Sequence, residues 1–128
     1  MDRESKRKDL KNSDLRVFSH LIYEYKKGVR DLILCTLTGD AEERVKIKLN
    51  KNAISYTIHK LGNGNINVFF GKEECLTVIN KICSDKTLNL LTPEEDFILG
   101  ILLGYSISEQ CNRYCKRKKE SHKNILIY

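Results

Sequence analysis

The middle of the chain constrains its fold most strongly, because two alternating segments flank a glycine-rich turn. Over residues 54–59 apolar and polar side chains alternate, and a second alternating apolar set lies at positions 66, 68 and 70. Between them lies Gly62-Asn63-Gly64, a sequence typical of a chain reversal. The pattern predicts a β-hairpin with one apolar face.

The register of this hairpin follows from the same pattern. The two apolar sets share one face if Ile58 pairs with Val68 and Tyr56 pairs with Phe70. That register requires a three-residue loop, and such loops place a residue with positive φ at their end. We therefore predict a positive φ at Gly64.

The elements before the hairpin are predicted from composition and spacing. Residues 17–25 are rich in β-branched and aromatic residues on both alternating faces, which favours a strand covered on both sides. After Gly28, residues 29–37 carry apolar side chains at helical spacing, and Gly39 closes that helix. Asp40 is then a candidate cap for a surface helix, which has a thin apolar stripe at Ala41, Val45 and Leu49.

Two more helices are predicted after the hairpin. Residues 72–83 begin with acids, and one helical face carries Cys75, Val78 (or Ile79) and Ile82. Thr92-Pro93-Glu94-Glu95 combines a hydroxyl cap, a proline at the first helical position and a capping-box glutamate. We expect this last helix to run unbroken to about Lys118.

The run Phe97–Tyr105 is apolar in every direction around a helix axis, so it must be buried on all sides. A domain with three short strands offers too little chain to cover it, which predicts a homodimer through this helix. Gly100 and Gly104 lie on one face and allow a close approach, either by a second copy or by a strand of the same subunit. The interface candidates are Phe97, Gly100, Ile101, Gly104 and Tyr105.

These elements predict the α+β class: a three-stranded, mostly antiparallel sheet with about four or five helices and a long C-terminal helix. The expected organisation is a flexible basic arm over residues 1–13, a single domain over 14–118 and a tail over 119–128. The 128-residue chain has a net charge of +6, and residues 1–12 and 113–128 hold 11 Lys and Arg against four acids. Solvated terminal charge is the simpler explanation, and nucleic-acid binding through Lys116, Arg117, Lys118 and Lys119 is the alternative.

No apolar run is long enough to span a membrane, and the first residues lack a secretory signal, so we expect a cytoplasmic protein. In that reducing compartment the five cysteines read as buried thiols. Cys111 and Cys115 lie one helical turn apart, with His122 further on, but a structural metal site needs four ligands. We therefore expect no metal and no cofactor.

His20 and Glu24 form the most suggestive polar pair. On a strand they would share a face, with Tyr23 and Tyr25 on the other. The imidazole and the carboxylate would then lie about two pleats apart, which is too far for a hydrogen bond between a general base and its orienting group without a bridging residue. No nucleotide-binding loop or nucleophile motif is present, so the chain is not expected to be an enzyme. An enzyme of unknown class using His20 and Glu24 remains the alternative.

Three segments, Phe18–Leu32, Ile66–Gly71 and Leu91–Gly100, together resemble a small bacterial family of domains of unknown function, number twenty twenty-three, known chiefly from Bacteroidetes. The resemblance covers residue 15 to about residue 116. It implies three strands with about five helices, a homodimer and no assigned activity. Members tend to be encoded near flavodoxins, so the resemblance also implies an acidic electron carrier as a partner.

We therefore expect an interaction or regulatory module that presents a polar, aromatic and basic surface to an acidic protein such as a flavodoxin. The candidate partner-binding residues are His20, Tyr23, Glu24, Tyr25, Lys26, Lys27 and Arg30.

Overall fold

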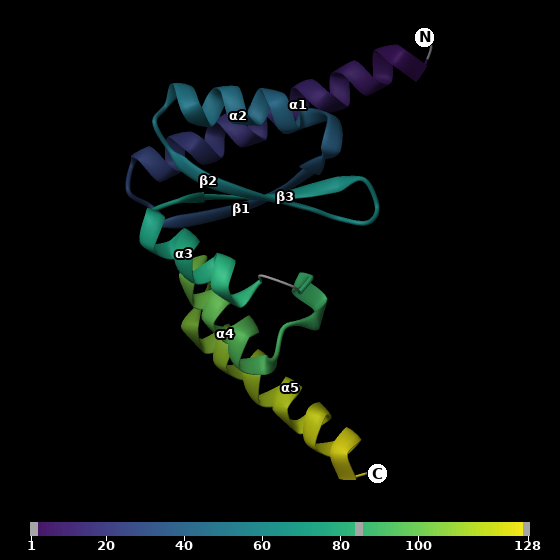
Figure 1. Cartoon of the computed structure of the whole chain (residues 1–128), viewed down its shortest axis with the longest axis vertical. Helices are drawn as coiled ribbons and strands as arrows, with labels where there is room; N and C mark the ends of the chain where they lie inside the picture. The colour runs from purple at the N-terminus through teal and green to yellow at the C-terminus, as the bar shows by residue number, and fades with distance from the viewer. Residues whose placement is uncertain (1–2, 84–85, 127–128) are drawn as a thin grey trace. The chain divides into compact units, whose positions relative to one another are not determined.

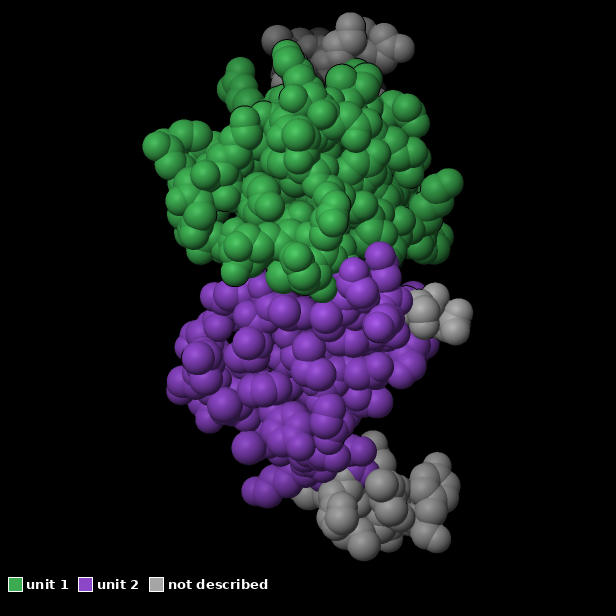
Figure 2. Space-filling model, turned by 60° about the vertical axis from the view of Figure 1, so that its left-hand side comes forward, with its two compact units in different colours: residues 1–76 green, residues 77–128 purple. Residues whose placement is uncertain are grey.

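The computed structural model describes the backbone of residues 3–83 and 86–126 and the side chains of residues 14–83 and 86–121. Over this part the chain forms five α-helices, two short 3-10 helices and one three-stranded sheet, so the predicted α+β class is confirmed (Figure 1). Two compact units divide at Leu76: residues 1–76 and residues 77–128 (Figure 2). No helix of the described chain is long and apolar enough to cross a membrane.

The sheet belongs to the first unit and is antiparallel throughout. Its strands β1 (Leu32–Thr38), β2 (Ser55–Lys60) and β3 (Asn65–Gly71) lie in the order β1-β3-β2. The hairpin prediction is confirmed, since Ile58 pairs with Val68 and Tyr56 with Phe70.

The predicted three-residue loop of the hairpin is also confirmed. The Leu61 N–H donates to the Asn65 carbonyl at 2.9 Å, which closes the loop over residues 62–64. Gly64 has φ +86°, as predicted.

Helices α1 (Arg3–Lys26) and α2 (Glu42–Lys51) cover one face of this sheet (Figure 1). Alternate strand residues point toward them because side chains alternate across a sheet. The resulting core consists of Phe18, Ile22, Ile33, Leu37, Val45, Leu49, Ile54, Ile66, Val68 and Phe70.

The predicted strand over 17–25 is wrong, because these residues belong to α1. Phe18, Ile22 and Tyr25 follow the i, i+4, i+7 spacing that places them on one helical face toward the sheet. The helix ends at Lys26, and Gly28 just beyond it has a φ of +79°. The Gly28 N–H bonds to the Tyr25 carbonyl and the Val29 N–H to the Glu24 carbonyl, which together form a Schellman motif. The flexible arm expected over 1–13 overlaps α1 and stays a prediction.

The predicted helix over 29–37 is also wrong, because this segment forms β1. Its apolar residues are nearly consecutive, and Ile33 and Leu37 face the α1–α2 layer, whereas Val29 is exposed. β1 ends where the Gly39 N–H donates to the Gly64 carbonyl at 2.8 Å. A β-carbon at Gly39 would lie 2.6 Å from that oxygen, so only glycine fits there.

The surface helix expected after Asp40 is confirmed as α2, with Val45 and Leu49 buried. Asp40 does not cap it: the cap residue is Ala41, and the Asp40 carboxylate accepts a hydrogen bond from Thr38 Oγ1 at 2.6 Å. The helix predicted over 72–83 is α3 (Glu73–Ile82). Its buried residues include Ile79, the alternative to Val78.

In the second unit, α4 (Pro93–Leu102) begins with the predicted capping box between Thr92 and Glu95. The unbroken helix to Lys118 is wrong, because α4 ends in a second Schellman motif with Gly104 at φ +79°. Ser106 then accepts a hydrogen bond from the Glu109 N–H at 3.4 Å and starts α5 (Ile107–Leu126). A long C-terminal helix is therefore confirmed, but it begins after Ser106 and not at Thr92. The single-domain boundaries stay a prediction.

Candidate functional site

The carboxyl end of α1 brings together most of the predicted partner-binding residues. His20 and Glu24 are one helical turn apart, and His20 Nε2 lies 3.3 Å from Glu24 Oε1. The expectation that these side chains are too far apart is therefore wrong, because it assumed a strand. Arg30, just after the helix, reaches back to place Nη2 3.7 Å from Glu24 Oε2.

An aromatic ring extends this ion-paired group across the surface. The Tyr23 ring stacks on His20 with centroids 6.2 Å apart, and Lys27 Nζ lies 5.3 Å from the Tyr23 centroid. Such a contact is a cation–π interaction. The Tyr23 ring therefore contacts both His20 and Lys27, and 55% of the residue is still exposed to solvent.

The two remaining candidates, Tyr25 and Lys26, have different surroundings. Tyr25 is partly buried and packs edge-on against Phe70, with centroids 6.1 Å apart, so it supports the core. Lys26 lines a hollow on the neighbouring side of the helix. We call the set His20, Tyr23, Glu24, Lys26, Lys27 and Arg30 the α1 surface.

The hollow beside the α1 surface has a volume of about 280 Å³ and lies between α1 and α2. Its lining residues are Ser19, Ile22, Tyr23, Lys26, Lys48 and Asn52. Lys48 Nζ bonds to Ser19 Oγ, and Asn52 Nδ2 donates to the Lys48 carbonyl at 2.8 Å.

This hollow was not predicted from the sequence. Ser19, Tyr23 and Lys26 share a helical face at the i, i+4, i+7 spacing, and the assignment of this segment as a strand hid that relation.

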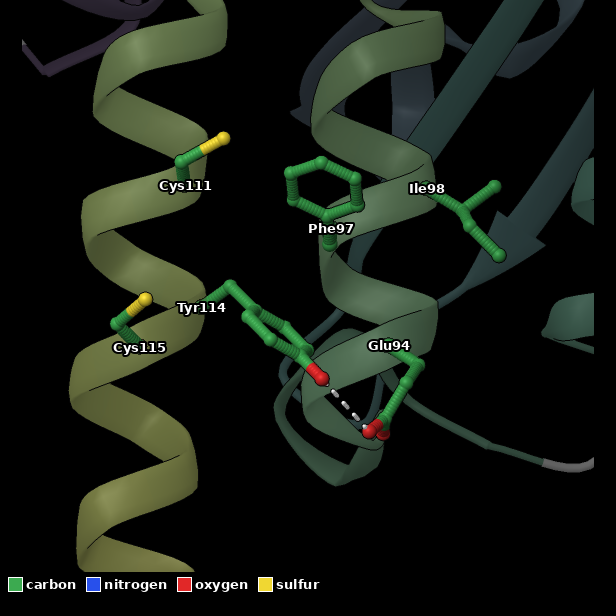
Figure 3. Close-up of a pocket in the computed structure, with 6 residues that line it drawn as sticks. All are labelled: Glu94, Phe97, Ile98, Cys111, Tyr114 and Cys115. Atoms are coloured by element: carbon green, nitrogen blue, oxygen red, sulfur yellow. Dashed lines mark hydrogen bonds between the residues drawn. The ribbon is translucent and has the colours of Figure 1, made fainter.

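A second, larger hollow of about 460 Å³ lies between α4 and α5 (Figure 3). Phe97 and Ile98 of α4 and Cys111 and Cys115 of α5 give it an apolar lining. At one end Tyr114 donates a hydrogen bond to Glu94 Oε1 at 3.3 Å. The lining suits an apolar group better than a charged one.

The cysteines differ in exposure, which corrects the expectation that all are buried. Cys111 and Cys115 are exposed, whereas Cys83 is buried and Cys35 and Cys75 are partly buried. Burial raises the pKa of the Cys35, Cys75 and Cys83 thiols. Within the described side chains no three metal-ligating groups cluster, and the side chain of His122 lies outside them.

The predicted dimer-interface residues have mixed positions. Ile101 and Tyr105 are exposed, and Phe97 is partly buried against Tyr114, with ring centroids 5.8 Å apart. Gly100 is buried against the side chain of Gln110 on α5, and Gly104 terminates α4. Both glycines therefore have a role within the chain.

The basic residues after Cys115 are partly engaged by α4. Arg117 Nη1 lies 3.4 Å from Asp96 Oδ1, and Lys118 Nζ lies 2.5 Å from Glu94 Oε1. Of the four tail cations considered for nucleic acid, two therefore pair with acids of the same chain. This pairing weakens the nucleic-acid interpretation.

The fold and these surfaces define a small α+β protein with an exposed basic and aromatic end of α1. The chain matches the family described as protein of unknown function (DUF2023) over residues 16–117, and it belongs to that family. This confirms the family resemblance seen in the sequence. Comparison with curated proteins finds no match.

Proposed function

We propose that the protein is a cytoplasmic binding module whose α1 surface docks an acidic partner protein. The observation that carries this proposal is the chain of contacts that joins Arg30, Glu24, His20, Tyr23 and Lys27 around one exposed ring. Side chains held in place before binding lose less entropy on binding, and exposed tyrosine is enriched among residues that dominate interface energies.

The charge of the α1 surface favours an acidic partner. Arg30 and His20 contact the carboxylate of Glu24, whereas no salt bridge joins Lys26 or Lys27 to an acid among the described side chains. Two lysines beside an exposed aromatic ring complement a patch of carboxylates and speed encounter with it. A flavodoxin is an acidic protein of the required kind, and the family resemblance suggests it.

Calorimetric titration of the full chain with a flavodoxin tests this function. We expect binding at low salt that weakens as salt rises, a loss of about tenfold in affinity for Tyr23→Ala and a smaller loss for Lys27→Ala. Lys60→Ala, which removes an exposed lysine from β2, is the charge-matched control and should bind normally. No heat at low salt, or equal losses for Lys27→Ala and Lys60→Ala, would refute the proposal.

We also propose a homodimer through α4 and the start of α5. Its basis is the exposed apolar side chains on α4 and at the start of α5: Ile98 is 42%, Ile101 37%, Tyr105 50% and Ile107 69% exposed. Glu94 and Asp96 of α4 already pair with Lys118 and Arg113 of α5. The exposed apolar side chains are therefore the groups left to be buried against a second copy. Light scattering at micromolar concentration should give twice the chain mass for the native protein and for Ile47→Asp, but a single mass for Ile101→Asp. A native monomer would refute it.

No observation favours the enzyme alternative. An enzyme would need a hollow that holds both side chains, and among the described residues neither His20 nor Glu24 lines the α1–α2 hollow or the α4–α5 hollow.

A further inference from the structure

We infer that the hollow between α1 and α2 is a carboxylate-binding pocket that receives an aspartate or glutamate side chain of the partner. The inference rests on the proposed function, because the hollow shares Tyr23 and Lys26 with the α1 surface. It assigns a role to Lys48, Ser19 and Asn52, which lie outside the predicted binding residues.

Lys48 carries the main part of the argument. Its side chain is partly buried at the hollow, and its ammonium group bonds to Ser19 Oγ. Among the described side chains no carboxylate lies within ion-pair distance of Lys48, whereas Lys46 on the same helix lies 3.9 Å from Glu42 and 3.8 Å from Glu43. A partly desolvated ammonium group is stabilised by an anion, and an ammonium has three donors, of which the hydroxyl takes one.

The rest of the lining suits a carboxylate on a short aliphatic stem. Asn52 uses one N–H of its amide on the Lys48 carbonyl, and an amide group has a second N–H to donate. Ile22 and the Tyr23 ring supply apolar wall for methylene groups, and Lys26 adds a second positive charge. This apolar wall favours a side-chain carboxylate over inorganic phosphate, because only the side chain has methylene groups to place against Ile22 and Tyr23.

The inference is tested by NMR titration of the full ¹⁵N-labelled chain with a hexaglutamate peptide. We expect saturable shifts of the Ser19, Tyr23, Lys48 and Asn52 amides. Lys48→Met should weaken peptide binding about tenfold, Lys48→Arg should largely retain it, and Lys46→Met, with the same change in charge on the same helix, should behave as the native chain.

Two other outcomes would overturn the pocket: equal weakening by Lys48→Met and Lys46→Met, or inorganic phosphate that shifts the same amides at lower concentration than the peptide. Failure of the docking function has a different signature. In that case a flavodoxin gives no calorimetric signal, while hexaglutamate still binds in a manner that depends on Lys48.

Discussion

Ala53 occupies a backbone position that glycine fills at the ends of two other helices. Its φ is +55°, its N–H bonds to the Asn50 carbonyl at 3.1 Å, and the Ile54 N–H bonds to the Leu49 carbonyl at 3.0 Å. α2 therefore ends in the same Schellman motif as α1 and α4, with a β-carbon in the left-handed region. That conformation costs an ordinary L-residue about 1 kcal/mol.

We expect Ala53→Gly to raise the free energy of unfolding by up to about 1 kcal/mol, since relief of the left-handed strain outweighs the added freedom of the unfolded chain. Gly28→Ala, at the equivalent position of α1, should lower it by about 1 kcal/mol. Nothing lies within 4 Å of a β-carbon built at Gly28, so its effect is purely conformational. Urea unfolding followed by circular dichroism measures both, and shifts of the same sign would contradict the argument.

Single residues were predictable from the sequence where the neighbouring residues alone fix the backbone conformation. Gly64 was predictable because both flanking strands point to one loop length. Gly28 and Gly104 are not predicted as helix ends, because the residues before Gly28 also fit a strand and because a single helix running to Lys118 leaves no place for the Ser106 cap.

Among the elements, α4 and α5 are joined by a group of ion pairs centred on Asp96. Arg113 Nε donates to Asp96 Oδ2 at 2.7 Å and its Nη2 to Oδ1 at 3.2 Å, while Arg117 Nη2 donates to the Leu91 carbonyl at 2.8 Å. Partial burial acts to raise the pKa of Asp96, but the Arg113 hydrogen bond and the charges of both arginines outweigh it and lower that pKa.

We expect Asp96→Asn to cost about 1–2 kcal/mol of unfolding free energy, because it removes a two-pronged charged hydrogen bond and leaves two arginines without their shared carboxylate. Glu120→Gln, an exposed neutralisation on α5, is the control and should change stability by less than about 0.5 kcal/mol. Thermal unfolding measures both, and equal effects would show that the Asp96 pairing contributes nothing.

Acid should weaken the second unit through the same residues. The hydrogen bond from Lys118 lowers the pKa of Glu94, that from Lys86 lowers the pKa of Glu95, and the pKa of Asp96 is lowered as well. Each folded-state pKa lies below its unfolded value, so the stabilisation is complete above about pH 5 and disappears as pH falls through the folded pKa values. Urea midpoints measured on acidification should fall, and fall less steeply in Asp96→Asn. A flat profile would contradict this.

Helices and strands were predicted correctly where the sequence pattern fits only one type of secondary structure. The capping box at Thr92 and the hairpin are of that kind. The predicted strand over 17–25 is a helix and the predicted helix over 29–37 is a strand. Short apolar runs fit both periods, and the strands that decide between them lie elsewhere in the sequence.

For the whole molecule, the exposure of its thiols gives a direct test of the structure. Cys111 and Cys115 are exposed, whereas burial raises the pKa of Cys35, Cys75 and Cys83. Because the thiolate is the reactive form, Ellman's reagent should modify two thiols quickly in dilute native protein and all five only after denaturation. Replacement of Cys111 and Cys115 by serine should abolish the fast phase. A fast phase that survives this replacement would contradict the structure.

The strand order has a consequence for synthesis on the ribosome. The central strand of the sheet, β3, is the last of the three in the sequence, and within the described chain β1 and β2 each pair with β3 alone. A nascent chain of which residues 1–60 have emerged therefore contains β1 and β2 but lacks β3, the strand with which both of them pair. The sheet can close only when Gly71 has left the exit tunnel, when translation has already reached the helices that follow. Until then the emerging amino-terminal half depends on its helices alone, and this is the interval in which a chaperone would meet it.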